Sequence, residues 1–97
     1  MKVRWLESAT NELEDIFVYI LKHSPRSAAS VARHIIERAE SLGEFPFKGE
    51  ETRRTGIRKL TVTNYPYVII YRVVEAAEEV QILNVRHTAR KQSPAEG

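Results

Sequence analysis

Basic side chains recur through the last third of the sequence, where strand-like apolar runs begin, end or cross a predicted sheet. They are Arg58, Arg72, Arg86, His87 and Arg90. A guanidinium group binds phosphate or carboxylate through its planar fork of N–H donors, and histidine is the side-chain type that changes charge near neutral pH. The pattern therefore indicates a site for an anion or an acidic partner.

Such a set of residues is compatible with three roles. The cations could support metal-free RNA cleavage, in which a base removes the 2′-hydroxyl proton, guanidinium groups stabilise the phosphorane and an acid protonates the leaving oxygen. The same cations could dock on an acidic protein surface without any reaction. A third interpretation is structural, with Arg72 and Arg86 paired to Glu78 or Glu79, which contributes little at a surface. The residue pattern leaves these alternatives open.

Charge is unevenly distributed along the chain, although the formal net charge is +2. Residues 53–59 and 86–91 carry 7 of the 15 lysines and arginines and no acid. The remainder is acidic, with 8 bases against 13 acids. An acidic body with two basic segments favours a local anion site over general coating of DNA.

The length of 97 residues fits one small domain. We expect a single domain over residues 1–90 and a flexible C-terminal tail over 91–97. No apolar run approaches the roughly 20 residues that span a bilayer, and no apolar leader follows Met1. The sequence lacks cysteine, and its three histidines lie far apart, without a metal-ligand spacing. We therefore expect a cytoplasmic protein without a metal, a cofactor or a membrane association.

The first half of the sequence predicts one strand followed by two helices. Residues 2–6 alternate as a short strand, and Ser8 is expected to cap a helix that ends shortly before the next cap. Ser24 and Pro25 fit the cap and the first position of a second helix, which should stop at Gly43. Because few residues separate the two helices, we expect them to pack as an antiparallel hairpin.

The second half predicts an irregular stretch over residues 44–56 and then three strands. The middle one, over residues 67–74, is apolar on both sides, which indicates a central strand with both faces covered. The last one covers residues 80–87. Consecutive strands with short links are expected to be antiparallel, and the helix hairpin should cover one face. The predicted fold class is α+β, with the order β-α-α-β-β-β and a mostly antiparallel sheet.

Several motifs in this order carry a resemblance to a known family. They are Trp5 with Ala9 and Leu13, the predicted helix over residues 25–42, Phe45-Pro46 followed by Gly49, and the runs GIRKL (56–60), YPYVIIYRV (65–73) and ILNVRHTAR (82–90). With them the chain resembles the ParE/RelE superfamily of bacterial type II toxins, over roughly residues 3–91. The resemblance implies a sheet that carries a helical hairpin, an antitoxin partner, and growth inhibition by the free toxin.

The two branches of this superfamily differ in their targets. ParE-like members are similar to this chain in the tyrosine-rich central strand and the closing motif from His87 to Arg90, and they inhibit DNA gyrase without a nuclease reaction. RelE-like members cut mRNA on the ribosome with basic residues on the sheet and often a tyrosine near the C-terminus. In that branch, the resemblance implies Arg58, Arg86 and His87 as catalytic residues. No tyrosine follows Tyr71, so the C-terminal acid of RelE-like enzymes has no counterpart here.

The resemblance therefore favours a ParE-like toxin of the plasmid-stabilisation type, which inhibits gyrase and is neutralised in a hetero-oligomer with its cognate antitoxin. The target-binding face would comprise Arg58, Arg86, His87, Arg90 and Lys91. One alternative is a RelE-like, ribosome-dependent mRNA endoribonuclease, and another is a non-toxic binding module of the same fold. Whether the chain is an enzyme depends on which of these holds.

Overall fold

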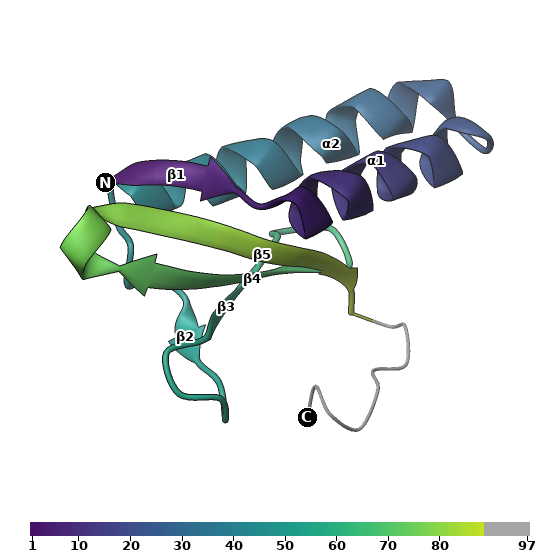
Figure 1. The fold of residues 1–97 in the computed structure, drawn as a ribbon. Coiled ribbons are helices and arrows are strands. Elements are labelled where there is room, and N and C mark those ends of the chain that lie inside the picture. The colour runs from purple at the N-terminus through teal and green to yellow at the C-terminus, as the bar shows by residue number, and fades with distance from the viewer. Residues whose placement is uncertain (89–97) are drawn as a thin grey trace.

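A computed structural model describes residues 1–88 of the chain, and residues 89–97, which include the predicted tail, lie outside this part. A strand comes first, two helices follow, and four further strands complete the described fold (Figure 1). The elements are β1 (Lys2–Trp5), α1 (Glu7–Leu21), α2 (Pro25–Glu40), β2 (Glu50–Glu51), β3 (Arg58–Thr61), β4 (Tyr67–Val74) and β5 (Glu79–His87), with short 3-10 turns η1 (Ser41–Gly43) and η2 (Glu75–Ala77).

The strands form one five-stranded sheet in the order β1-β5-β4-β3-β2. β1 runs parallel to β5, and the other neighbours are antiparallel. Both helices lie on the same side of this sheet (Figure 1). The predicted α+β fold, with a helical hairpin on a mostly antiparallel sheet, is thus confirmed. The short strand β2 is an addition, because it lies in the stretch that was expected to be irregular.

The two helix starts differ in how they are capped. At α2 the prediction is confirmed, because the Ser24 side chain accepts from the Ser27 N–H and Pro25 occupies the first position. At α1 the predicted cap is wrong. Leu6 is the N-cap residue there and provides no side-chain bond, while Ser8 lies inside the first turn. The Ser8 hydroxyl donates to the Leu83 carbonyl at 2.6 Å, so it ties the helix to β5 instead.

The hydrophobic core lies between the helices and the sheet, as the apolar stripes of the helices predict. Its buried members come from α1, α2, η1, the Leu60–Val62 region and strands β4 and β5. They are Ala9, Val31, Ile35, Ala39, Leu42, Leu60, Val62, Tyr67, Ile69, Tyr71, Val80, Ile82 and Val85. This packing fixes which residues of each strand face the helices and which face away.

β5 contains one extra residue relative to β4. Ile70 pairs with Asn84 and Tyr71 pairs with Ile82, so Leu83 bulges out of the ladder. Because of this bulge, Ile82 and Val85 are both buried although they are three positions apart. The bulge therefore turns Asn84 and Arg86 toward the face of the sheet that the helices leave open.

β4 holds the predicted central position, but its two faces are unequally covered. Tyr67, Ile69 and Tyr71 are buried under the helices and the loop after η1, whereas Val68 and Ile70 on the opposite face are half-buried. The expectation of two covered faces is therefore wrong for the second face. Within residues 1–88 no helix has the length and apolar character needed to cross a membrane.

Candidate functional site

The open face of the sheet carries a hollow of about 630 Å³. Its floor includes Val68 and Ile70 of β4, and its wall is the turn that joins β2 to β3. Cations gather here from three segments, together with two acids of β2; the charged lining residues are Arg53, Arg54, Lys59, Arg86, Glu50 and Glu51. An apolar floor rimmed by cations can accept an acidic surface or an anionic ligand.

Arg86 enters the hollow from β5 and is held by the first helix. Its Nε lies 3.6 Å from Glu12 Oε2. The other carboxylate oxygen of Glu12 accepts from the Val85 N–H and from Asn84 Nδ2, each at 3.0 Å. Because β1 ends at Trp5, Glu12 satisfies a backbone group on the part of β5 that β1 does not reach.

The third interpretation, in which Arg72 and Arg86 pair directly with Glu78 or Glu79, differs from the contacts in the structure. Arg86 forms its ion pair with Glu12, and neither Glu78 nor Glu79 is the partner shown for it. Arg72 donates from Nε to Gln81 Oε1 at 2.7 Å. Gln81 in turn donates to Glu79 at 2.8 Å, so Arg72 reaches that acid through a bridging amide.

The turn between β2 and β3 is shaped by one threonine. Thr52 Oγ1 donates to the Ile57 carbonyl at 2.9 Å and accepts from the Arg54 N–H at 3.2 Å. Gly56 has a φ of 79°, a left-handed conformation that glycine adopts without strain. This turn places Arg53 and Arg54 at the hollow. Their basic segment is evident in the sequence, but these two residues are not among the predicted site residues.

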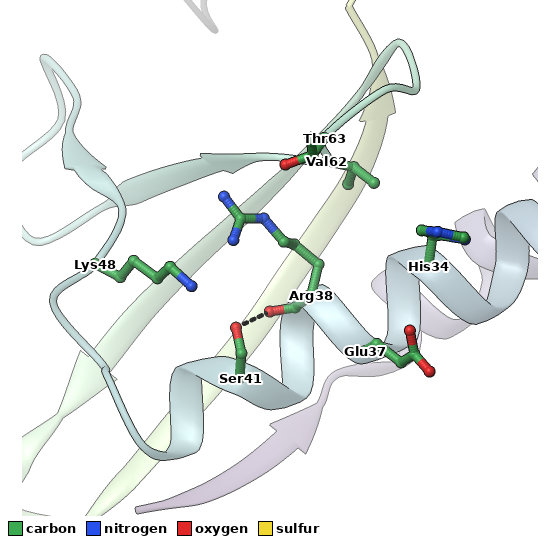
Figure 2. A pocket seen from close by; sticks show the side chains of 7 residues that line it. All are labelled: His34, Glu37, Arg38, Ser41, Lys48, Val62 and Thr63. Atoms are coloured by element: carbon green, nitrogen blue, oxygen red, sulfur yellow. Dashed lines mark hydrogen bonds between the residues drawn. The ribbon is translucent and has the colours of Figure 1, made fainter.

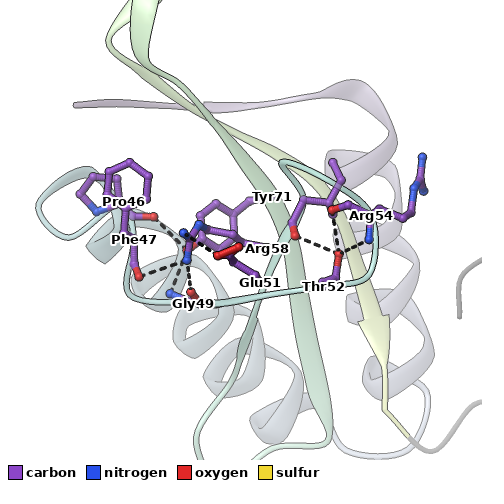
Figure 3. Close-up of polar contacts among 9 residues, drawn as sticks. Pro46, Phe47, Gly49, Glu51, Thr52, Arg54, Arg58 and Tyr71 are labelled. Atoms are coloured by element: carbon purple, nitrogen blue, oxygen red, sulfur yellow. Dashed lines mark hydrogen bonds and ion pairs between the residues drawn. The ribbon is translucent and has the colours of Figure 1, made fainter.

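Arg58 is engaged with the chain's own loop. Its Nη1 donates to the Gly49 carbonyl at 2.7 Å, and its guanidinium lies 5.0 Å from the centre of the Phe47 ring. Glu51 adds an ion pair at 3.9 Å (Figure 3). The Arg58 side chain is 22% exposed. In this structure the residue fastens the loop over residues 46–49 to β3.

Tyr71 holds the same loop from beneath. Its hydroxyl donates to the Pro46 carbonyl at 2.9 Å and accepts from the Gly49 N–H at 2.8 Å (Figure 3). Burial raises the pKa of the Tyr71 phenol, and the Gly49 N–H and the Arg58 charge oppose part of that rise. From the sequence, Tyr71 is predicted only as part of the central strand over residues 67–74. A buried tyrosine needs a partner for its hydroxyl, which is the signal that could have revealed the anchor.

His87 packs on the helix-covered face. Its ring meets the Tyr67 ring edge-on, with centroids 5.2 Å apart, and the next residue, Thr88, donates its N–H to the Pro66 carbonyl. Arg90 and Lys91, the remaining members of the predicted target-binding face, lie outside the described residues.

The sheet register does not bring the three predicted catalytic residues together. Arg58 pairs across the sheet with Tyr71 and His87 with Tyr67, so both start from the covered face, about 13 Å apart along β4 at 3.3 Å per residue. Arg86 pairs with Val68 and lies on the open face. No group of three or more potential metal ligands occurs within residues 1–88.

The fold defined by these elements occurs in solved toxin–antitoxin proteins. A chain of the chromosomal ParDE toxin–antitoxin system from P. aeruginosa matches with a TM-score of 0.81, at 24% identity over 90% of this chain and 95% of that one. A chain of the RelBE2 toxin–antitoxin complex from Mycobacterium tuberculosis matches with a TM-score of 0.63, at 27% identity over 92% of both chains. This likeness defines the class as the ParE/RelE fold.

Sequence comparison gives the family within that class. Toxin RelE2 of Caulobacter vibrioides is 37% identical over 89 residues, which cover 92% of this chain and 97% of that protein. The profile of the family described as the ParE toxin of the type II toxin-antitoxin system, parDE, matches residues 3–92. The chain belongs to this family and is a type II toxin. Its solved relatives occur in toxin–antitoxin complexes, which supports an antitoxin as its partner.

Proposed function

We propose that this toxin inhibits DNA gyrase by binding, without a chemical step, and that its cognate antitoxin neutralises it. The supporting observation is the separation of the residues that a RelE-like reaction would use. RNA cleavage needs guanidinium groups and an acid or base to converge on one phosphate. Arg58 and Arg86 instead start from opposite faces of the sheet.

The contacts of the two arginines point in the same direction. The shortest hydrogen bond of Arg58 goes to the Gly49 carbonyl, in the loop before β2. Arg86 is oriented by Glu12, whose carboxylate would compete with a phosphate for the same guanidinium. Such partners suit residues that shape a surface more than residues that stabilise a transition state.

The open-face hollow is the binding surface that we assign to the target. Arg53 and Arg54 provide positive charge beside the half-buried Val68 and Ile70. Lys59 and Arg86 also line the hollow, and they form ion pairs with Glu50 and Glu12. A protein surface that presents acidic side chains around an apolar one complements this arrangement. Arg90 and Lys91 follow β5 in sequence and stay in the proposal as target-binding residues. His87 is the last residue of β5 and packs against Tyr67 on the helix-covered face, so it does not belong to this surface.

A supercoiling assay with purified gyrase, relaxed plasmid and the full chain tests this proposal. We expect the chain to reduce supercoiling, and Arg53→Gln with Arg54→Gln to weaken that inhibition by about tenfold, the effect of about 1.4 kcal/mol. Arg26→Gln with Arg33→Gln is the matched control, because it removes two exposed cations from α2. Undiminished supercoiling at excess chain would contradict the proposal, as would an equal loss in the control.

A RelE-like, ribosome-dependent endoribonuclease is the second candidate, because the 37% identical relative is named Toxin RelE2. Mapping of mRNA 5′ ends after induction separates the two functions. Cuts at the ribosomal A site that disappear in Arg86→Gln would establish the nuclease and refute the binding proposal. Both targets lie in the cytoplasm, which is the location expected from the sequence.

A further inference from the structure

We propose that a second hollow, on the helix side of the molecule, binds one carboxylate from a protein partner. It measures about 250 Å³ and lies between α2, the loop before β2 and the end of β3. Its lining residues are His34, Glu37, Arg38, Ser41, Lys48, Val62 and Thr63 (Figure 2). It shares no lining residue with the open-face hollow.

Arg38 is the residue that gives this hollow its chemistry. Its Nε donates to the Thr61 carbonyl at 2.9 Å, and the residue is half-buried. This bond fixes the plane of the guanidinium and leaves its terminal fork of two NH₂ groups directed at the space beside Lys48 (Figure 2). A guanidinium that is oriented in advance loses little entropy when its fork binds the two oxygens of a carboxylate.

Lys48 brings a second positive charge to the same space. Its side chain extends into the space between Arg38 and Ser41 (Figure 2). Its ammonium group lies 6.0 Å from the centre of the Phe45 ring. Within residues 1–88 neither cation has an acid at ion-pair distance. Two cations that line one hollow without an ion-paired acid repel, and a bound anion reduces this repulsion.

The charge and size of the hollow select the anion. Glu37 also lines it, so with histidine counted as neutral the formal charge is +1. That charge balances one carboxylate, whereas a phosphate monoester carries about −1.5 to −2 and would be repelled more strongly by Glu37. A hollow of about 250 Å³ also lies below the roughly 300–1,000 Å³ of pockets that hold whole small molecules. It fits one acidic side chain.

The surroundings indicate that the carboxylate comes from a protein. The Phe45 and Phe47 side chains are 57% and 51% exposed. With Lys48 they line a neighbouring apolar depression, so Lys48 belongs to both surfaces. A protein segment with one acidic and one apolar side chain would fill both at once. The partner that we assign is the cognate antitoxin, so this identification rests on the toxin family and not on gyrase binding.

The first experiment measures the site itself in the full chain. The Nε–Hε resonance of Arg38 is followed by NMR during titration with sodium acetate, with inorganic phosphate in a parallel arm, at constant ionic strength because salt screens ion pairs. We expect a saturable shift with acetate. Lys48→Gln should weaken it by about tenfold, as expected for loss of a charged hydrogen bond. Arg33→Gln, on the same helix but outside the hollow, should leave it unchanged.

A shift with phosphate alone would overturn the carboxylate assignment, and no saturable shift with either anion would overturn the site. The second experiment measures the Kd of the cognate antitoxin for the full toxin. Lys48→Gln, which changes an exposed side chain, should raise the Kd by about tenfold, and Arg33→Gln should not. Equal Kd values for the two variants would refute the partner. Neither experiment reads gyrase, so failure here is distinguishable from failure of the proposed function.

Discussion

Replacement of Tyr71 by phenylalanine tests how much the buried Tyr71 hydroxyl contributes to holding the loop over residues 46–49, which Arg58 also contacts. The Tyr71 side chain is fully buried, and its hydroxyl bonds both the Pro46 carbonyl and the Gly49 N–H. A net contribution of about 1 kcal/mol for each hydrogen bond gives about 2 kcal/mol. Gly49 is also buried, and leaving its N–H unpaired raises the expected loss toward about 3 kcal/mol.

The assay is urea denaturation followed by the fluorescence of Trp5, the single tryptophan, and by far-ultraviolet circular dichroism. In thermal denaturation of a two-state domain of this size, the same loss of free energy of unfolding corresponds to a fall in Tm of roughly 10–20 °C. Tyr19→Phe is the matched control, because that side chain is 62% exposed, and its free energy of unfolding should change by less than about 0.5 kcal/mol. A Tyr71→Phe variant as stable as the control would refute the reasoning.

The remaining predictions concern the same loop and the helix–strand contact. Gly49→Ala should cost about 1–3 kcal/mol in urea denaturation, because a Cβ there would lie 2.6 Å from the Lys59 carbonyl oxygen; wild-type stability would contradict the close approach. Glu12→Ala should lower the free energy of unfolding by about 2 kcal/mol and speed hydrogen exchange at the Val85 N–H. Glu12→Gln, which keeps an acceptor oxygen, should lower the free energy of unfolding by less. Unchanged exchange at Val85 would contradict the hydrogen bond from its N–H to Glu12. Folded Tyr71 keeps its proton to a higher pH than Tyr71 in the unfolded chain, because burial raises its pKa. The stabilisation from the buried, protonated phenol is therefore fully present below about pH 10. Above that pH the free energy of unfolding falls by up to about 1.4 kcal/mol per pH unit. Denaturation across this range should therefore show a flatter profile in Tyr71→Phe, and parallel profiles would contradict the burial of the phenol.

The order of elements was predictable because the periodic signals are strong. The Ser24-Pro25 start of α2 and the apolar run of β4 follow from local rules of capping and patterning, and both are confirmed. β2 could not be predicted from its own residues, because Glu50 and Glu51 have low strand propensity and pair only through their partners on β3. Ser8 shows the opposite failure, since tertiary contact with Leu83 takes the hydroxyl that local rules assign to a cap.

The candidate site was predictable in composition but not in geometry. The charge of the segment with Arg53 and Arg54 indicates an anion site, and the structure shows that both residues line the open-face hollow. The separation of Arg58 from Arg86 could not be foreseen, because the face of each residue depends on strand register. The bulge at Leu83 shifts that register by one position, and no glycine or proline marks it in the sequence.

The place of β1 in the sheet also bears on when the toxin becomes competent during its synthesis. Lys2 and Val3 lie beside Glu79 and Val80, so the first strand pairs with the last. Closure of so long a loop makes folding slow relative to contacts between neighbouring segments. A nascent chain that ends before residue 79 lacks β5, the strand that joins β1 to the rest of the sheet. The five-stranded sheet can therefore close only after the residues of β5 have been synthesised, so shorter nascent chains lack the folded toxin.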